Sequence, residues 1–124
     1  MNLLLDTHIL LWWLGDSARL SKRARRAIED AGTAWVSAVT GWEIETKRGR
    51  GLLDAPDNLE ETLRACNLPS LPLSLAHAIA AAKLPMLHRD PFDRILVAQA
   101  GLESLVLLTA DRQLEAYGGP VIVA

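Results

Sequence analysis

Four acidic residues lie close to apolar segments of the sequence, each in a different part of the chain. Asp6 directly follows an apolar run near the start, and Asp111 comes two residues after another such run, L-V-L-L-T. Glu43 lies six residues beyond a third apolar segment, and Asp93 opens the stretch that leads into the run before Asp111. If these carboxylates converge, they repel one another unless a cation neutralises them. Oxygen ligands without paired cysteines or histidines favour Mg²⁺, with Mn²⁺ able to substitute.

A divalent cation held by carboxylates suits the hydrolysis of phosphodiester bonds. Metal-activated water attacks, and the metal stabilises the negative charge that develops. The spacing alone leaves a simpler alternative open for three of the acids. Asp6, Asp93 and Asp111 stand at or near the starts of expected helices, where aspartate commonly caps the backbone. Glu43 is harder to explain in this way, because its neighbours Trp42 and Ile44 are expected to face the core and a buried carboxylate is costly unless something binds it.

The elements that would position these acids alternate between strand and helix. Strands are expected at Asn2–Leu5, Thr33–Ser37, Leu71–Leu73, Leu105–Thr109 and Val121–Val123. Helices are expected at Ile9–Leu14, between Ser21 and Gly32, at Ala38–Lys47, from the capping pair Asp57 and Glu60 to Cys66, and at Leu75–Leu84, Phe92–Ala100 and Asp111–Tyr117. This alternation predicts an α/β fold with a parallel sheet covered by helices on both faces. Pro72 places the third strand at an edge of the sheet. Such sheets bind ligands beyond the carboxyl ends of their strands, where the acids are expected to meet.

Four sequence blocks resemble the signature blocks of PIN-domain ribonucleases, and most closely those of VapC-type toxins of bacterial toxin–antitoxin pairs. They are L-L-L-D-T-H-I-L-L-W-W (3–13), W-V-S-A-V-T-G-W-E-I (35–44), H-R-D-P-F-D-R-I-L-V-A-Q-A (88–100) and L-L-T-A-D (107–111). The blocks stand in the family's order and span nearly the whole chain. The resemblance implies a single PIN-like domain over residues 1–124, with a sheet of about five parallel strands between helices.

The resemblance also assigns the acids of the site. It matches Asp6, Glu43, Asp93 and Asp111 to the four family acids that hold the metal and carry out catalysis. Asp93 is chosen as the third acid because it directly precedes the R-I-L-V-A-Q-A segment. The supporting residues expected around the acids are Thr7, Ser37 and Thr109, with Asp90 to orient the loop or to serve as the alternative third acid.

The implied function is a Mg²⁺-dependent endoribonuclease that acts as the toxin of a pair. An antitoxin protein is expected to block its site, and a homodimer is the family expectation. Two basic groups are candidate RNA contacts, because cations bind the phosphate backbone. They are Lys47, Arg48 and Arg50, one helical turn past Glu43, and Lys22 and Arg23 on the basic second helix.

Composition narrows the remaining classes of protein. The 124 residues carry 13 basic and 15 acidic side chains, a net charge of −2, so a globally basic nucleic-acid binder is excluded. The single cysteine, Cys66, excludes an internal disulfide and is expected to fill the core as a small residue. No apolar run approaches the roughly 18–20 residues of a membrane span. The start of the chain also lacks the pattern of a signal peptide, so a cytoplasmic protein without membrane contact is expected.

Two other functions compete with the nuclease. A phosphoacceptor receiver domain needs an acid pair after the first strand and a lysine after the last one, and this chain has neither. A non-catalytic RNA- or protein-binding module on the same fold stays open, although four intact acids argue against it.

Overall fold

The computed structural model describes all residues, 1–124, and its centre is a sheet of five parallel strands. The strands are β1 (Asn2–Leu5), β2 (Thr33–Ser37), β3 (Ser70–Leu71), β4 (Val106–Thr109) and β5 (Val121–Val123). Their order across the sheet is β3-β2-β1-β4-β5, and each neighbouring pair is parallel. The predicted α/β class and the parallel sheet are confirmed. The third strand is shorter than expected, but it does lie at the edge, where Pro72 needs no ladder partner.

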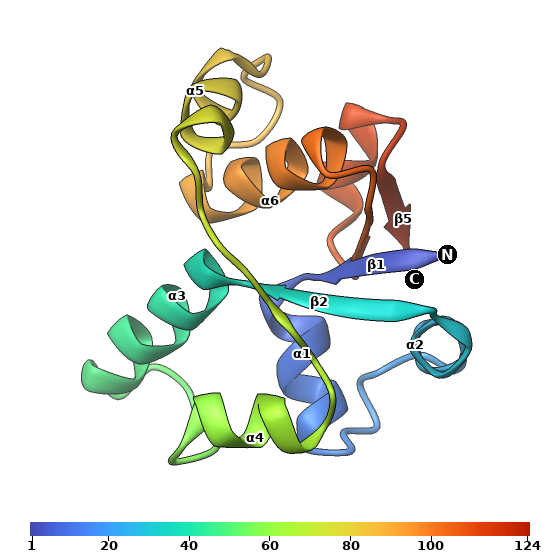
Figure 1. Cartoon of the computed structure of the whole chain (residues 1–124), viewed down its shortest axis with the longest axis vertical. Helices are drawn as coiled ribbons and strands as arrows, with labels where there is room; N and C mark the ends of the chain where they lie inside the picture. The colour runs from blue at the N-terminus through green and yellow to red at the C-terminus, as the bar shows by residue number, and fades with distance from the viewer.

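Helices cover both faces of the sheet (Figure 1). They are α1 (Thr7–Leu14), α2 (Lys22–Asp30), α3 (Ala38–Gly49), α4 (Leu59–Ala65), α5 (Leu75–Lys83), α6 (Pro91–Leu102) and the 3₁₀ helix η1 (Arg112–Tyr117). In Figure 1, α1, α2 and α4 lie on one side of β1 and β2, and α5 and α6 lie on the other. The longest of these helices have 12 residues, and none combines the length and apolarity of a membrane span.

The two-residue period of the strands divides the core between these helical layers. Leu3 and Leu5 of β1 pack into a cluster with residues of α1, α2 and α4, whereas Leu4 between them packs with α6 and η1. All three leucines are fully buried. Apolar side chains are therefore needed on both faces of β1, which explains why the strand appears in the sequence as an unbroken apolar run.

The order of the strands reverses at β1, so the switch point of the sheet lies between the carboxyl ends of β1 and β4. From β1 the chain passes through α1 and α2 to β2 on one side, and it returns to β4 on the other side. Leu5 and Leu108 are in register, and the backbone N–H of Asp6 donates to the carbonyl of Leu108 at 3.0 Å. Ligands of open α/β sheets bind at such a reversal, so the fold itself points to the surroundings of Asp6.

Two local expectations are wrong. Helix α4 is capped by Asn58, whose side chain accepts from the backbone N–H of Glu61 at 3.2 Å, and not by the pair Asp57 and Glu60. Asparagine and aspartate cap helices equally well, so two adjacent candidates could not be separated by residue type. Cys66 follows α4 at the surface and is exposed, so it does not fill the core.

Candidate active site

Asp6 stands at the N-cap position of α1, but its side chain caps nothing. Instead Oδ2 accepts a hydrogen bond from the hydroxyl of Thr109 at 2.5 Å, across the carboxyl ends of β1 and β4. The residue is only 5% exposed. The capping alternative for Asp6 is therefore wrong. Its carboxylate lies at the carboxyl ends of β1 and β4, and Oδ2 is its only oxygen that accepts a side-chain hydrogen bond.

Glu43 reaches the same rim from the second turn of α3, and it is 4% exposed. Its Oε1 accepts from the hydroxyl of Thr7 at 2.7 Å, and its Oε2 accepts from Nζ of Lys47 at 2.6 Å. The Thr7 hydroxyl also lies 3.4 Å from that of Thr40, a fully buried residue that the sequence did not single out. Something does bind the buried Glu43 carboxylate, as its environment requires: one hydroxyl and one ammonium group.

Asp93 lies in the first turn of α6, three residues after the residue that caps this helix. The cap is Asp90, whose Oδ1 accepts from the backbone N–H of Phe92 at 2.8 Å and of Asp93 at 3.5 Å. The Asp93 side chain forms no ion pair with Arg89 or Arg94. Because Asp90 caps the helix, the carboxylate of Asp93 is not needed for capping and can face the other acids.

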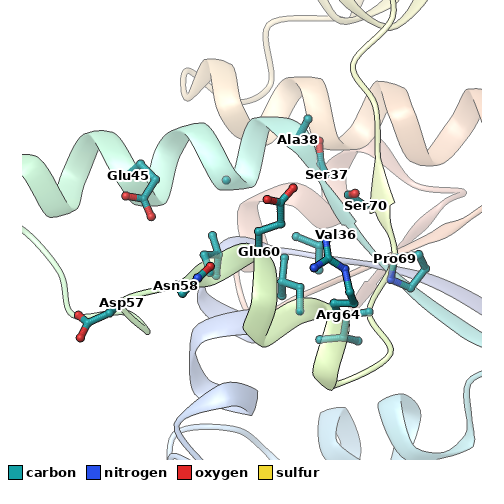
Figure 2. A pocket seen from close by; sticks show the side chains of 14 residues that line it. Val36, Ser37, Ala38, Glu45, Asp57, Asn58, Glu60, Arg64, Pro69 and Ser70 are labelled. Atoms are coloured by element: carbon teal, nitrogen blue, oxygen red, sulfur yellow. The ribbon is translucent and has the colours of Figure 1, made fainter.

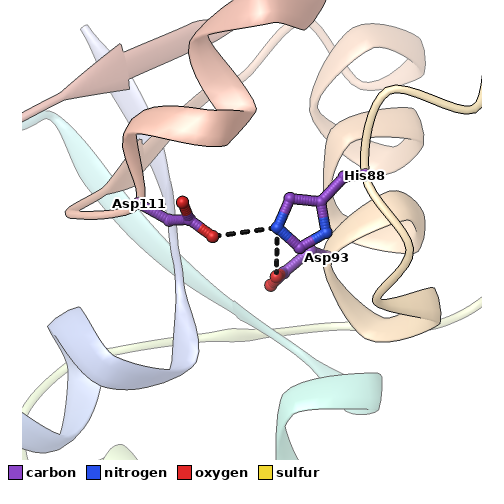
Figure 3. Close-up of side chains that lie close together, drawn as sticks. All are labelled: His88, Asp93 and Asp111. Carbon is purple, nitrogen blue, oxygen red and sulfur yellow. Dashed lines mark hydrogen bonds and ion pairs between the residues drawn. The ribbon is translucent and has the colours of Figure 1, made fainter.

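Asp111 performs two tasks, because it caps η1 and also joins the acid group. Its Oδ1 accepts from the backbone N–H of Gln113 at 2.9 Å, as the capping alternative predicted. Its Oδ2 lies 2.9 Å from Nε2 of His88, which in turn lies 3.7 Å from Oδ2 of Asp93 (Figure 3). The three ligand-type atoms of His88, Asp93 and Asp111 lie within 4.8 Å of one another. His88, the first residue of the third signature block, thus contacts two of the acids directly.

The charges of these carboxylates act on one another. Burial, followed by the charges of Asp6 and Asp90, raises the pKa of Asp93 from 3.8 to about 7. Burial also raises the pKa of Asp6, opposed by the Thr109 hydrogen bond, and Glu43 adds to the rise. The hydrogen bond to Glu43 raises the pKa of Lys47, to which the charges of Asp90 and Asp93 contribute. One ammonium group thus faces several carboxylates, and the negative charge that remains suits a divalent cation.

Comparison with known proteins agrees with this architecture. The family model of the PIN domain matches residues 3–120. Ribonuclease VapC22 of Mycobacterium tuberculosis is 30% identical over 123 residues, which cover 96% of this chain and 94% of the relative. The chain belongs to the PIN-domain family, in its VapC group.

Solved structures of other proteins have the same fold as this PIN domain. A toxin–antitoxin complex from Klebsiella pneumoniae superposes with a TM-score of 0.70 at 20% identity, covering 98% of this chain and 96% of that one. VapBC2 from Rickettsia felis, solved bound to a DNA fragment from its promoter, gives a TM-score of 0.67 at 14% identity over 100% and 98% of the two chains. Similarity at this level of identity shows the fold, which is the one described above.

Only some of the remaining predicted site residues of this PIN domain contact the acids. Thr7 and Thr109 contact the acids directly, but the hydroxyl of Ser37 caps α3 by accepting from the backbone N–H of Val39 at 3.1 Å. Arg48 is turned away from the rim, since it pairs with Glu45 at 3.1 Å and donates to the carbonyls of residues 55 and 56. Of the first basic group, the structure therefore brings only Lys47 to the acids.

The second basic group opens α2. Lys22 is exposed, and the guanidinium of Arg23 donates to the carbonyl of Val123 on edge strand β5 at 3.4 Å. Neither side chain contacts an acid of the site.

Trp42 lies on α3 directly before Glu43, and it does not face the core as expected. It is 64% exposed, and its ring meets Phe92 of α6 edge-on at 5.3 Å between centroids. Successive helical residues point about 100° apart, so burying Glu43 toward the other acids turns Trp42 outward. Sequence neighbours on this helix therefore have opposite environments.

A groove of about 680 Å³ lies between α3 and α4, and none of the four acids lines it. Figure 2 shows Glu45, Asp57 and Glu60 around it with Arg64 below. Ser37, at the start of α3, lies in its wall. The four acids converge instead at the carboxyl ends of β1 and β4, away from this groove.

The raised pKa of Asp93 predicts an unusual dependence of stability on pH. The folded protein holds a proton at Asp93 between about pH 4 and 7, where the unfolded chain has lost it, so the stabilisation is complete below pH 3.8 and is lost as the pH rises through about 7. The metal-free PIN domain is therefore expected to gain stability as the pH falls from 8 to 5, by about 2 kcal/mol once solvent screening of this partly exposed group is allowed for. Urea unfolding in EDTA at several pH values measures this. A free energy of unfolding that rises between pH 5 and 8 contradicts it.

Proposed function

We propose that this PIN domain is a metal-dependent endoribonuclease, with Mg²⁺ as its ion, and the toxin of a toxin–antitoxin pair. The observation that carries the proposal is the meeting of four carboxylates, from β1, α3, α6 and the segment after β4, at one rim of the sheet. The relative named as a ribonuclease covers almost the whole chain, which supports the same activity.

The donor set fits a hard divalent cation. Oδ1 of Asp6 accepts no side-chain hydrogen bond, and the Asp93 carboxylate has no partner closer than His88 at 3.7 Å. Asp6, Asp93 and Asp111 would hold the ion, with Glu43 completing the set once Lys47 releases it. When bound, the ion would supply an activated water and stabilise the charge developing on the phosphate.

The other polar residues support this arrangement. Thr109 and Thr7 each donate to one carboxylate oxygen, which fixes the orientation of Asp6 and of Glu43. The other oxygen of Glu43 is the one that Lys47 binds. Lys47 balances Glu43 in the structure, and we propose that its ammonium group moves to the RNA phosphate when the ion binds. Arg50, Lys22 and Arg23 remain candidates for contacts farther along the RNA, whereas Arg48 is already engaged by Glu45.

The proposed partners follow from the same family. The solved neighbours are toxin–antitoxin complexes, which supports an antitoxin that binds this chain and blocks its site. We also propose a homodimer, and activity in the cytoplasm, where cellular RNA substrates of such a toxin occur.

Removal of the metal tests the proposed activity. Purified protein is incubated with total RNA in Mg²⁺, in Mn²⁺, and in excess EDTA. Cleavage is expected in both metals and is expected to fall at least about a hundredfold in EDTA, because the carboxylates alone supply neither the activated water nor charge stabilisation. EDTA saturated with excess Mg²⁺ is the control and is expected to restore cleavage. RNA that is bound but left intact in either metal, or cleavage that persists in EDTA, contradicts the proposal.

A further inference from the structure

His88 lies in the loop between α5 and α6, and one nitrogen of its ring faces two of the proposed metal ligands (Figure 3). Nε2 faces Oδ2 of Asp111 at 2.9 Å and Oδ2 of Asp93 at 3.7 Å. On the other side of the ring, Nδ1 accepts a hydrogen bond from the backbone N–H of Asp90 at 3.1 Å. Each ring nitrogen therefore has its own partner, and the partners are of opposite kinds.

These partners determine where the imidazole carries its proton. A backbone N–H can only donate, so Nδ1 must be the nitrogen with the free lone pair. The proton of the neutral ring is then on Nε2, which points at the carboxylate of Asp111. A nitrogen that carries a proton has no lone pair for a metal, so the close grouping of His88, Asp93 and Asp111 is not a three-ligand site.

We propose that His88 is a positioning residue: its Nε2–H donates to Asp111 and orients that carboxylate for the ion, and the imidazole itself does not bind the metal. The inference rests on the proposed function for the metal, but the position of the proton does not. Asp111 needs such a partner because its side chain is 37% exposed, the most accessible of the acids. With Gln113 N–H on Oδ1 and His88 on Oδ2, both oxygens have donors that fix the plane of the carboxylate.

The loop that carries His88 is itself held in place. The backbone N–H of His88 donates to the hydroxyl oxygen of Tyr117 at 3.2 Å, and that hydroxyl donates to the carbonyl of Pro85 at 2.9 Å. Arg94 contacts both the Tyr117 hydroxyl and the Pro85 carbonyl, at 3.3 and 3.0 Å. The ring therefore reaches Asp111 from a fixed backbone, as a positioning residue must.

The first measurement concerns the proton alone and needs neither metal nor RNA. Long-range ¹H–¹⁵N correlation of the metal-free protein, with the His88 signals assigned by comparison with His88→Gln, distinguishes the two ring tautomers. The proton is expected on Nε2. A proton on Nδ1 overturns the inference, whether or not the protein proves to be a nuclease.

The second measurement concerns the metal. Pulsed EPR of the Mn²⁺-loaded protein is expected to show no directly bonded ¹⁴N, and calorimetry is expected to show a tenfold to hundredfold loss of Mn²⁺ affinity in His88→Leu. His88→Gln, whose side-chain amide keeps a donor near Nε2, is expected to stay within about threefold of wild type. A bonded ¹⁴N signal that disappears in His88→Gln overturns the inference. Absence of any Mn²⁺ binding in the wild type, with the expected tautomer, overturns the proposed function instead.

Discussion

The substitution Asp93→Asn is expected to reduce RNA cleavage by at least about a hundredfold while it makes the metal-free protein more stable. The amide keeps the shape of the side chain but loses the charge that would bind the ion. It also removes a buried carboxylate whose pKa is raised to about 7 by burial and by its acidic neighbours. Acids gathered at a functional site commonly lower the stability of the fold that holds them. At pH 8 in EDTA, the melting temperature is expected to rise by about 3 °C or more.

Asp90→Asn provides the matched control, three residues away in the same turn. Asp90 accepts from the backbone N–H groups of Phe92 and Asp93, and an asparagine oxygen can accept the same bonds. Cleavage by this variant is expected to stay within about tenfold of wild type. Cleavage assays and thermal melts of both variants decide between the two aspartates. If Asp90→Asn loses activity and Asp93→Asn keeps it, the third acid of the site is Asp90.

Arg94→Leu is expected to have the largest effect on stability. Arg94 is 7% exposed, and its guanidinium has no carboxylate partner. It donates instead to the carbonyls of Ala81 and Leu84 at the end of α5, at 2.8 and 3.1 Å, and to that of Pro85 at 3.0 Å. The negative end of the α5 dipole helps to hold this buried cation. Leucine would leave the carbonyls without donors, and the free energy of unfolding is expected to fall by about 3–5 kcal/mol.

Urea unfolding of the metal-free protein, followed by circular dichroism, measures this change. Arg94→Lys is expected to recover little of the loss, because an ammonium group lacks the planar fork that reaches several carbonyls at once. Arg26→Leu on the exposed surface of α2 is the control, expected to change the free energy of unfolding by less than about 0.5 kcal/mol. A loss of less than about 1 kcal/mol in Arg94→Leu would show that the hydrogen bonds of Arg94 do not hold the loop.

Much of the fold follows from local patterns. The apolar runs predict β1, β2, β4 and β5 to within a residue, because strands buried on both faces need apolar side chains at every position. Ser21, the start of the helix expected up to Gly32, does cap α2, since its side chain accepts from Ala24 N–H. The errors are also local. Asn58 and Asp57 are equivalent as caps, and the residue type of Trp42 does not reveal whether its side chain is buried or exposed. Residue type could not resolve either case.

The sequence by itself determined which carboxylates belong together. The parallel sheet that it predicts places Asp6 and Asp111 at the carboxyl ends of neighbouring strands, and the family blocks add Glu43 and Asp93. Only the tertiary structure decided which hydrogen-bond partner each carboxylate oxygen has, because these partners lie far apart in the chain. Thr109 and Asp6 are separated by 103 positions in the sequence, Thr7 and Glu43 by 36, and His88 and Asp111 by 23. Hydrogen bonds at such separations depend on how the helices pack on the sheet, and periodicity along the chain carries no record of that packing.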